Sequence, residues 1–537
     1  MSLPDYLAIL MFVTACGALM LGYSVAFTLG GISLIFAAIG VATGTFEPSF
    51  LLAIPGRIFP LITKEILMAV PLFVFMGVML EKSKLAEDLL EAMADLFGAV
   101  RGGLGVSVVL VGALLAASTG IVGATVVTMG LLSLPTMLSR GYAPSLASGA
   151  IAASGTLGQI IPPSIVLVIL GDQLSNAYQE AQRAHGLQTD GVISVGDLFA
   201  GAILPGLILV GLYALYIMFM AVTKPEMAPA IKRDKGVHIS VFLKRVLKAM
   251  LPPILLIVAV LGSILYGYAT PTRGAALGAL GAILLAAFKL AEDRPSVQKF
   301  VLLAAFSLIA IIAVDLSGID IRFEQDIWNL NERVALSVTL FLSGLSILGV
   351  VGALAYLGKL GQLSAVSRQT MYITSMVFVI LIGATMFSLV FRGFGGDDLV
   401  GAILSGAPGG PVGALILVMA VMFFLGFFLD FIEITFVIVP LVAPPLLAMN
   451  LAGAGMTPIY MDPIWLGILM ALNLQTSFLT PPFGFALFYL RGVAPPEVTT
   501  TALYKGVLPF IGIQIFVIIL VAMFPAIATS LPEIMTK

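Results

Sequence analysis

The sequence has little of what most soluble enzymes use for chemistry. Only 10% of its 537 residues are charged, and it contains two histidines and a single cysteine, Cys16. One cysteine cannot form a disulfide within the chain, and the two histidines, His185 and His238, both fall in hydrophilic segments. A Cys/His metal cluster is therefore excluded. The chain also lacks a Walker A loop, which argues against direct ATP hydrolysis.

Apolar residues dominate what remains. They make up 60% of the chain, more than a soluble fold can bury, so we predict an all-α polytopic membrane protein. Charged residues cluster between long uncharged stretches, which is typical of charge confined to loops. The N-terminus carries Asp5 and no Lys or Arg before its first apolar run, so we interpret that run as a first span rather than a cleavable signal.

The span pattern gives a topology. A transmembrane helix needs about 20 apolar residues. The loop 223–248 carries more Lys and Arg than any other loop, so the positive-inside rule places it in the cytoplasm. The same rule places the acidic loop 316–334 and the long polar loop 172–197 in the periplasm. The predicted spans are 5–22, 24–43, 66–81, 146–171, 198–222, 249–269, 273–289, 299–315, 335–358, 369–391, 463–490 and 506–529.

Two apolar stretches do not fit a simple alternation of spans. The first has halves at 104–118 and 121–138 that meet at Ser118-Thr119-Gly120, and its flanks fall on the same side. About fifteen helical residues reach only about 22 Å, less than a bilayer core of about 30 Å. We therefore expect a re-entrant helical hairpin. A second hairpin is expected at 411–449, with its tip near Leu429-Asp430 and the opposite orientation.

A polar, proline-containing run follows each hairpin. The runs are SGTLGQIIPPS at 154–164 and NLQTSFLTPPFG at 473–484, and each Pro-Pro pair is expected to break a helix. These helix-breaking residues are Pro162, Pro163, Pro481 and Pro482. One such span can be only a kinked helix without a ligand. Two in matching positions, each after a hairpin of opposite orientation, indicate the inverted repeats of a secondary transporter, with both breaks at a common ion or substrate site.

Charged residues near these segments have both structural and functional interpretations. Asp430 and Glu433 share a helix face by their i,i+3 spacing, and a carboxylate inside a membrane is costly enough to indicate function. The alternative is a pair beside a water-filled end of the hairpin. Arg273 and Arg392 sit at predicted periplasmic ends of spans, so we interpret them as interfacial anchors, with substrate ligands as the alternative. Segment 81–100 is amphipathic and is expected to brace the first hairpin, without chemistry of its own.

At this point the residues resemble a known family, the large membrane subunit of tripartite ATP-independent periplasmic (TRAP) transporters. The resemblance covers essentially the whole chain. It implies an elevator-type transporter in a bacterial inner membrane, driven by sodium, that imports a small organic acid and needs no cofactor beyond that coupling ion. It also implies two partners, a small four-helix membrane subunit and a periplasmic substrate-binding protein. The motifs that carry it are GQIIPPS (158–164), FLDFIEI (428–434), ATPTRGAA (269–276), AGAILPG (200–206) and LTPPFGF (479–485).

Sodium favours oxygen ligands, which hairpin tips and helix breaks supply as free carbonyls and nearby hydroxyls. Half-helix N-termini near the same breaks favour a substrate carboxylate. The hydroxyls expected near sodium are those of Ser154, Thr156, Thr476 and Ser477. The full set of sodium and substrate candidates is Ser118, Thr119, Gly120, Ser154, Gly155, Thr156, Asp430, Glu433, Asn473, Gln475, Thr476 and Ser477.

Some features depart from the common family pattern. The family commonly reads TPTEAAA where this chain has TPTRGAA, so Arg273 replaces an acidic group. A two-span insert near 290–360 and the lengthened loop 172–197 are similar to the branch of larger subunits. The expected division is 1–103 N-terminal scaffold and amphipathic arm, 104–171 first transport repeat, 172–410 periplasmic loop with scaffold spans and insert, 411–492 second transport repeat, and 493–537 C-terminal span.

Three other functions remain open at this point. A membrane-embedded enzyme would need a nucleophile, base or metal constellation, and no histidine falls in a predicted span. An ion channel has no need for two opposed hairpins. A stand-alone sodium/dicarboxylate carrier of related two-hairpin design would need no binding protein, and it is the nearest alternative.

Overall fold

The computed structural model describes residues 2–97, 100–184, 193–230, 239–317, 330–449, 461–482 and 484–535. All regular secondary structure in these ranges is helical. The elements are α1 (Leu3–Met20), α2 (Val25–Ala42), α3 (Ser49–Leu52), α4 (Ile54–Thr63), η1 (Glu65–Met68), α5 (Ala69–Lys82), α6 (Leu85–Phe97), α7 (Gly103–Thr119), α8 (Val122–Ser139), α9 (Pro144–Thr156), η2 (Leu157–Gln159), α10 (Ile165–Ala184), α11 (Val195–Thr223), α12 (Ile239–Leu265), α13 (Pro271–Leu290), α14 (Pro295–Leu316), α15 (Leu330–Lys359), α16 (Gln362–Gly393), α17 (Gly396–Ser405), α18 (Gly410–Leu425), α19 (Phe431–Val437), α20 (Val439–Ala448), α21 (Pro463–Leu479), α22 (Phe485–Val493), α23 (Thr500–Met523) and α24 (Ala526–Met535).

The helices are long and apolar enough for a membrane. Ten described helices can cross a bilayer, and the number rises to twelve if each of two bent helix pairs counts as one span. This confirms the prediction of an all-helical polytopic membrane protein. Large apolar side chains remain exposed along α1, α14, α15 and α23, as expected where the solvent is lipid.

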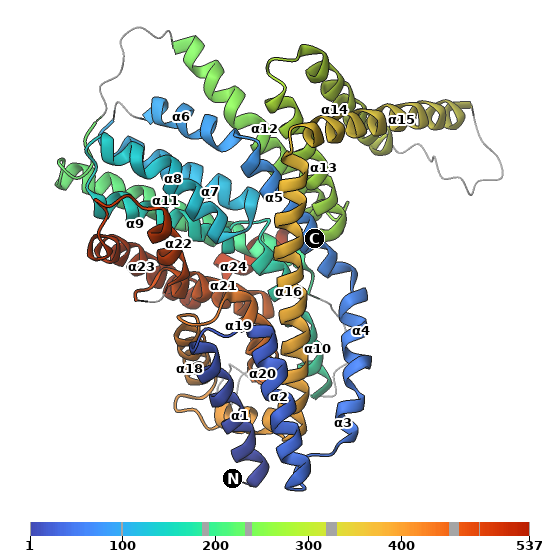
Figure 1. Cartoon of the computed structure of the whole chain (residues 1–537), viewed down its shortest axis with the longest axis vertical. Helices are drawn as coiled ribbons and strands as arrows, with labels where there is room; N and C mark the ends of the chain where they lie inside the picture. Colours follow the sequence, from blue (N-terminus) through green and yellow to red (C-terminus); the bar gives the residue numbers. More distant parts are fainter. Residues whose placement is uncertain are drawn as a thin grey trace.

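The helices form groups that differ in direction (Figure 1). Helices α6 to α9, α11, α21 and α23 lie together across the upper left of the view, whereas α1, α2, α18 and α20 lie lower and run closer to the long axis. Helix α16 runs along that axis beside both groups and packs against α2, α5 and α19. The insert helices α14 and α15 project at the upper right, where they pack on each other and on α13.

Short polar sequences start several of these helices. Ser194 begins α11, where its hydroxyl accepts a hydrogen bond from the Asp197 N–H at 3.1 Å and the Asp197 carboxylate accepts one from the Ser194 N–H at 2.9 Å. Thr499 caps α23 in a similar way by accepting from Ala502 N–H at 3.1 Å. Such caps satisfy amide groups that lipid cannot solvate.

The segment 172–197 differs from the expected periplasmic loop. Residues 172–184 continue α10, so the helix does not end at 171. Asp172 is only 5% exposed and its Oδ1 lies 2.5 Å from the Lys64 Nζ. Glu180 pairs with Arg392 at 3.3 Å, so Arg392 is an ion-pair partner rather than only an interfacial anchor. Asp172 and Glu180 lie on the polar part of α10 that follows the first break. Each acid is paired with a basic side chain of the same chain, which supplies the countercharge.

The remainder of that predicted loop, 185–192, lies outside the described residues, as do 318–329 of the predicted acidic loop. Asp197, also expected on the loop surface, instead caps α11. The sequence further missed α3 and α4, α17 and α24. The segment from 49 to 63 holds two prolines and Arg57, so it contains no uninterrupted apolar run, and its helices join η1 and α5 through a 54° bend.

Candidate functional site

The first predicted hairpin is formed by α7 and α8, which pack against each other. The helices end and begin within about a residue of the predicted limits. Gly120 makes the turn with a φ of +61°, in the left-handed region where a side chain is strained, and its N–H donates to the Ala116 carbonyl at 2.9 Å. The Thr119 and Thr125 hydroxyl oxygens lie 2.7 Å apart across the turn. This tip is therefore closed by its own hydrogen bonds.

The second hairpin turns between α18 and α19. Asp430 begins α19, where its carboxylate accepts a hydrogen bond from the Phe431 N–H at 2.6 Å. The Glu433 carboxylate accepts one in return from the Asp430 N–H at 3.0 Å, and Glu433 is 6% exposed. The two acids thus form a capping box at the tip, a structural role beside any functional one. The second arm is bent by 55° between α19 and α20, which the sequence did not predict.

Both proline-containing runs interrupt a helix. Helix α9 ends at Thr156, a single 3-10 turn follows, and α10 starts at Ile165. Helix α21 ends at Leu479 and α22 starts at Phe485. The bonds Pro162–Pro163 and Pro481–Pro482, one in each gap, are both cis. The breaks therefore occupy matching positions after the two hairpins.

The two hairpin tips open onto one cavity of 410 Å³, which we term the hairpin-tip cavity. Residues 121–124 of the first tip and 430–432 of the second line it together. Helices α5 and α16 supply much of its wall, and Phe478 and Tyr489 flank it from the region of the second break. Segments distant in sequence therefore line one cavity.

The charged groups of this cavity come from two elements. Asp430 lines it from the second tip, and Glu81 and Lys82 line it from the end of α5. Glu81 Oε1 lies 3.7 Å from Lys82 Nζ, whereas its buried Oε2 has no hydrogen-bond partner within the described chain. Segment 81–100, for which we expected no chemistry, thus contributes two charged residues to the cavity wall, because α5 extends through Lys82 and the amphipathic helix α6 starts only at Leu85.

Sequence offered only a weak signal for Glu81 and Lys82. They follow a long apolar run, as many interfacial charges do, and only the position of α5 beside the first tip shows that they line the cavity. The cavity thus combines two carboxylates with one ammonium group. Such a set can hold a cation and a substrate carboxylate together.

The four hydroxyls expected to hold sodium are all buried outside the wall of the hairpin-tip cavity. Each donates its proton to a carbonyl oxygen one turn earlier in its own helix, so its lone pairs stay available to a cation or a donor. The pairs are Ser154 to Ile151, Thr156 to Ala153, Thr476 to Leu472 and Ser477 to Leu474.

Among the remaining predicted residues, Asn473 and Gln475 make hydrogen bonds between helices. The Asn473 amide of α21 donates to the Met419 carbonyl of α18 at 2.8 Å, and Gln475 Nε2 donates to Thr156 Oγ1 at 3.4 Å. Ser118 donates to the Leu115 carbonyl at 2.9 Å beside the first tip, and Gly155 lies next to Thr156 at the end of α9. The predicted residues therefore separate into a group at the hairpin tips and a buried group in the helices that precede the two breaks, α9 and α21.

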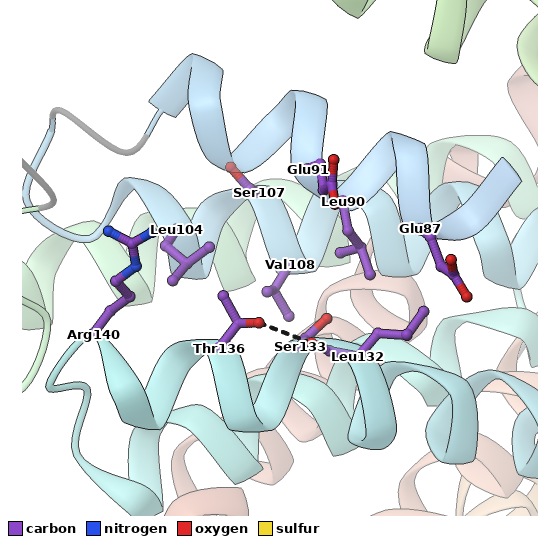
Figure 2. A pocket seen from close by; sticks show the side chains of 10 residues that line it. All are labelled: Glu87, Leu90, Glu91, Leu104, Ser107, Val108, Leu132, Ser133, Thr136 and Arg140. Atoms are coloured by element: carbon purple, nitrogen blue, oxygen red, sulfur yellow. Dashed lines mark hydrogen bonds between the residues drawn. The ribbon is translucent and has the colours of Figure 1, made fainter. Parts of the chain in front are cut away.

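A second hollow, of 460 Å³, lies between α6 and the first hairpin (Figure 2). Figure 2 shows Glu87 and Arg140 toward opposite ends of it, with Thr136 donating to the Leu132 carbonyl at 3.0 Å. The Ser107 hydroxyl also donates to the Met93 carbonyl at 2.7 Å, which fixes α6 on α7. None of the predicted ligands lines this hollow, so we assign the candidate site to the hairpin-tip cavity.

Comparisons with a family model and with individual proteins point to the same family of transporters. Residues 10–527 match the family model described as tripartite ATP-independent periplasmic transporter, DctM component. The C4-dicarboxylate TRAP transporter large permease protein DctM of Vibrio cholerae is 25% identical over 98% of this chain and 97% of its own length. The ectoine TRAP transporter large permease protein TeaC of Halomonas elongata is 25% identical over 98% and 99%. The isethionate TRAP transporter permease protein DctMQ of Oleidesulfovibrio alaskensis is 24% identical over 86% and 57%.

The cavity predicts a pattern of thiol labelling. In a Cys16→Ser background, Ala124→Cys should react with a small water-soluble thiol reagent, because Ala124 lines the hairpin-tip cavity. Ala117→Cys, buried on α7 and outside that lining, is the matched control and should react at least tenfold more slowly. Rates are read from mass shifts over time. Equal rates at the two positions would contradict a water-accessible cavity at the tips.

Proposed function

The chain belongs to the family of DctM components of tripartite ATP-independent periplasmic transporters, and we propose that it imports a small organic acid with sodium through the hairpin-tip cavity. One observation carries the proposal. Two hairpin tips, more than 300 residues apart in sequence, line the same 410 Å³ space. That volume falls in the usual range for small-molecule sites. Paired hairpins with broken helices are the arrangement in which secondary transporters place substrate and ion together.

The charges of the cavity support a carboxylate as substrate. Lys82 is the single cation among the described residues that line it, and its ammonium group can attract a carboxylate. Relatives are named for C4-dicarboxylates, ectoine and isethionate, all small polar solutes. From the carboxylates of Glu81 and Asp430 we infer that a cation enters the same cavity, because two carboxylates and one ammonium leave an excess of negative charge.

Sodium coupling follows from that shared space. An ion held near Asp430 and a carboxylate held near Lys82 attract each other, so the binding of one raises the affinity for the other. The same coupling is reciprocal by thermodynamic necessity. We infer that the protein undergoes its transport movement when both the ion and the substrate are bound.

The packing supports an elevator in which the two repeats move as one unit. Helix α10, which follows the first break, packs along α20 of the second hairpin, and α21 contacts α9. Helices α1, α2 and α16 would then belong to the scaffold. We assign the protein to the bacterial inner membrane, with a small four-helix subunit beside the scaffold and a periplasmic binding protein that delivers the substrate.

Reconstitution tests this function. Purified chain, small subunit and binding protein in proteoliposomes should accumulate a labelled organic acid only when an inward sodium gradient is present. A panel of labelled C2 to C6 carboxylates identifies the substrate. Uptake that is equally fast without the binding protein would favour the stand-alone carrier, and uptake that ignores the sodium gradient would contradict sodium coupling.

The charge of Asp430 is predicted to be essential. Asp430→Asn should lower sodium-driven uptake at least tenfold while leaving the protein folded, because asparagine caps a helix about as well as aspartate. Asp462→Asn is the matched control, since Asp462 also caps a helix, accepting from Trp465 N–H at 2.8 Å, and does not line the cavity. Initial uptake rates are compared at equal amounts of membrane-inserted protein. Wild-type uptake by Asp430→Asn would leave the residue with a capping role alone.

The charge of Lys82 is predicted to act on substrate affinity. Lys82→Gln should raise the substrate KM about tenfold, equivalent to about 1.4 kcal/mol, with a smaller change in the maximal rate. Lys84→Gln, two residues further on and exposed, should keep the wild-type KM. Both values come from uptake at saturating sodium. An unchanged KM for Lys82→Gln would place the substrate carboxylate elsewhere in the cavity.

A further inference from the structure

The wall of the hairpin-tip cavity is chemically uneven. Its charged and amide side chains are those of Glu81, Lys82, Gln369 and Asp430, and most of its other lining residues are apolar. Ligand sites commonly combine an apolar lining with a few polar groups that orient the ligand. The positions of these four residues therefore indicate which part of a substrate is polar.

Lys82 and Gln369 lie at one end of the cavity. Both also line a neighbouring hollow of 440 Å³ at the start of α16, so the two spaces meet at these residues. Val70 lies about 18 Å from Lys82 along α5, and Val377 lies about 12 Å from Gln369 along α16, at about 1.5 Å per residue. Because α5 and α16 pack against each other, these two valines belong to an apolar section beyond the polar end.

Aromatic rings from the second repeat complete the apolar wall. Phe431 of the second tip packs on Phe478 of α21 with ring centroids 6.0 Å apart, and both residues are buried and line the cavity. Tyr489 of α22 faces the first tip, where a Cβ atom on Gly123 would come within 3.1 Å of its ring. Rings held by their neighbours in this way offer a fixed apolar surface to a hydrocarbon group.

The charges suit one substrate carboxylate and not two. Lys82 is the single cation among the described residues that line the cavity, and the Gln369 amide can donate a hydrogen bond at the same end. Lys82 Nζ lies 3.7 Å from Glu81 Oε1 and forms no ion pair with Asp430. A sodium ion at Asp430 would neutralise that carboxylate without leaving a positive charge for another acid group. A second substrate carboxylate would therefore lose its hydration without gaining a partner, which is costly.

An apolar group in the same place gains affinity instead. Each methylene that moves from water into an apolar site raises affinity about fourfold. The section of the cavity between Val70, Val377 and the rings of Phe431 and Phe478 provides such a site. The cavity thus favours a molecule with one acid end and one apolar end.

We propose that the substrate is a monocarboxylate with an apolar body, aromatic or aliphatic. Its carboxylate binds toward Lys82 and Gln369, and its body lies between α5, α16 and the rings of Phe431 and Phe478. This class excludes the C4-dicarboxylates for which one relative is named. The inference rests on the proposed function for the carboxylate at Lys82 and extends it by naming the rest of the molecule.

Three acids with the same six-carbon chain test this class. Hexanoate ends in a methyl group, adipate in a second carboxylate and 6-aminohexanoate in an ammonium group. The thermal midpoint of unfolding of the purified full-length chain in detergent is recorded against each acid at constant sodium concentration and ionic strength. The half-stabilising concentration of hexanoate should be at least tenfold below those of the other two acids. From butanoate to hexanoate it should fall about fourfold for each added methylene.

A variant of the apolar wall shows where the body binds. Val377→Thr places a hydroxyl group in the wall, so it should raise the half-stabilising concentration of hexanoate at least fivefold and leave that of acetate within twofold. Val366→Thr is the matched control, since Val366 is buried on the same helix and does not line the cavity. Lys82→Gln should instead weaken acetate and hexanoate by the same factor.

The outcomes separate this inference from the proposed function. Adipate or 6-aminohexanoate that binds as tightly as hexanoate would overturn the apolar body, as would binding that does not depend on chain length. The carboxylate site would survive either result if Lys82→Gln still weakened binding. A wild type that none of these acids stabilises would overturn both. Because no sodium gradient is used, uptake that proves independent of sodium would leave the substrate class intact.

Discussion

The fold depends on one constraint, that no backbone polar group can be left unsatisfied in lipid. A helix satisfies its own groups except at its ends, so each break inside the membrane must be enclosed by protein. The ends of α9 and α21 meet this requirement, because their last residues are buried on all sides. The two hairpins, α11 and α23 surround those ends. The arrangement of these elements follows from the need to cover two interrupted helices.

This constraint explains which features the sequence could predict. The first hairpin was located to within about a residue, because Gly120 and the polar residues around it interrupt an apolar run in a way that has few structural solutions. The two helix breaks at the Pro-Pro pairs could be predicted from the sequence equally well. In contrast, the helical continuation of α10 past Asp172 was missed, because charges that normally mark a loop are here paired with Lys64 and Arg392. These ion pairs join residues that are far apart in sequence, so the local sequence around α10 does not reveal them.

For the same reason, the sequence could predict some residues of the candidate site and not others. Asp430 was identified because a carboxylate within an apolar run is unusual. Glu81 and Lys82 resembled ordinary residues at the end of a span, and only the contact of α5 with the first hairpin brings them to the cavity. Gln514 and Tyr213 lie within largely apolar stretches of α23 and α11, where the sequence alone gives them no special role. Only the packing of α9, α11 and α23 brings them together, so that Gln514 Nε2 lies 3.4 Å from the Thr156 hydroxyl oxygen and donates to the Tyr213 hydroxyl at 2.8 Å.

The polar residues buried around Thr156 are uncharged, and this has an electrical consequence. Thr156, Tyr213, Gln475 and Gln514 carry no formal charge, unlike the carboxylate at the second hairpin tip. A membrane potential contributes about 2.3 kcal/mol per elementary charge for each 100 mV crossed. A voltage therefore exerts no net force on these four side chains and acts instead on the charged residues that line the hairpin-tip cavity, Glu81, Lys82 and Asp430.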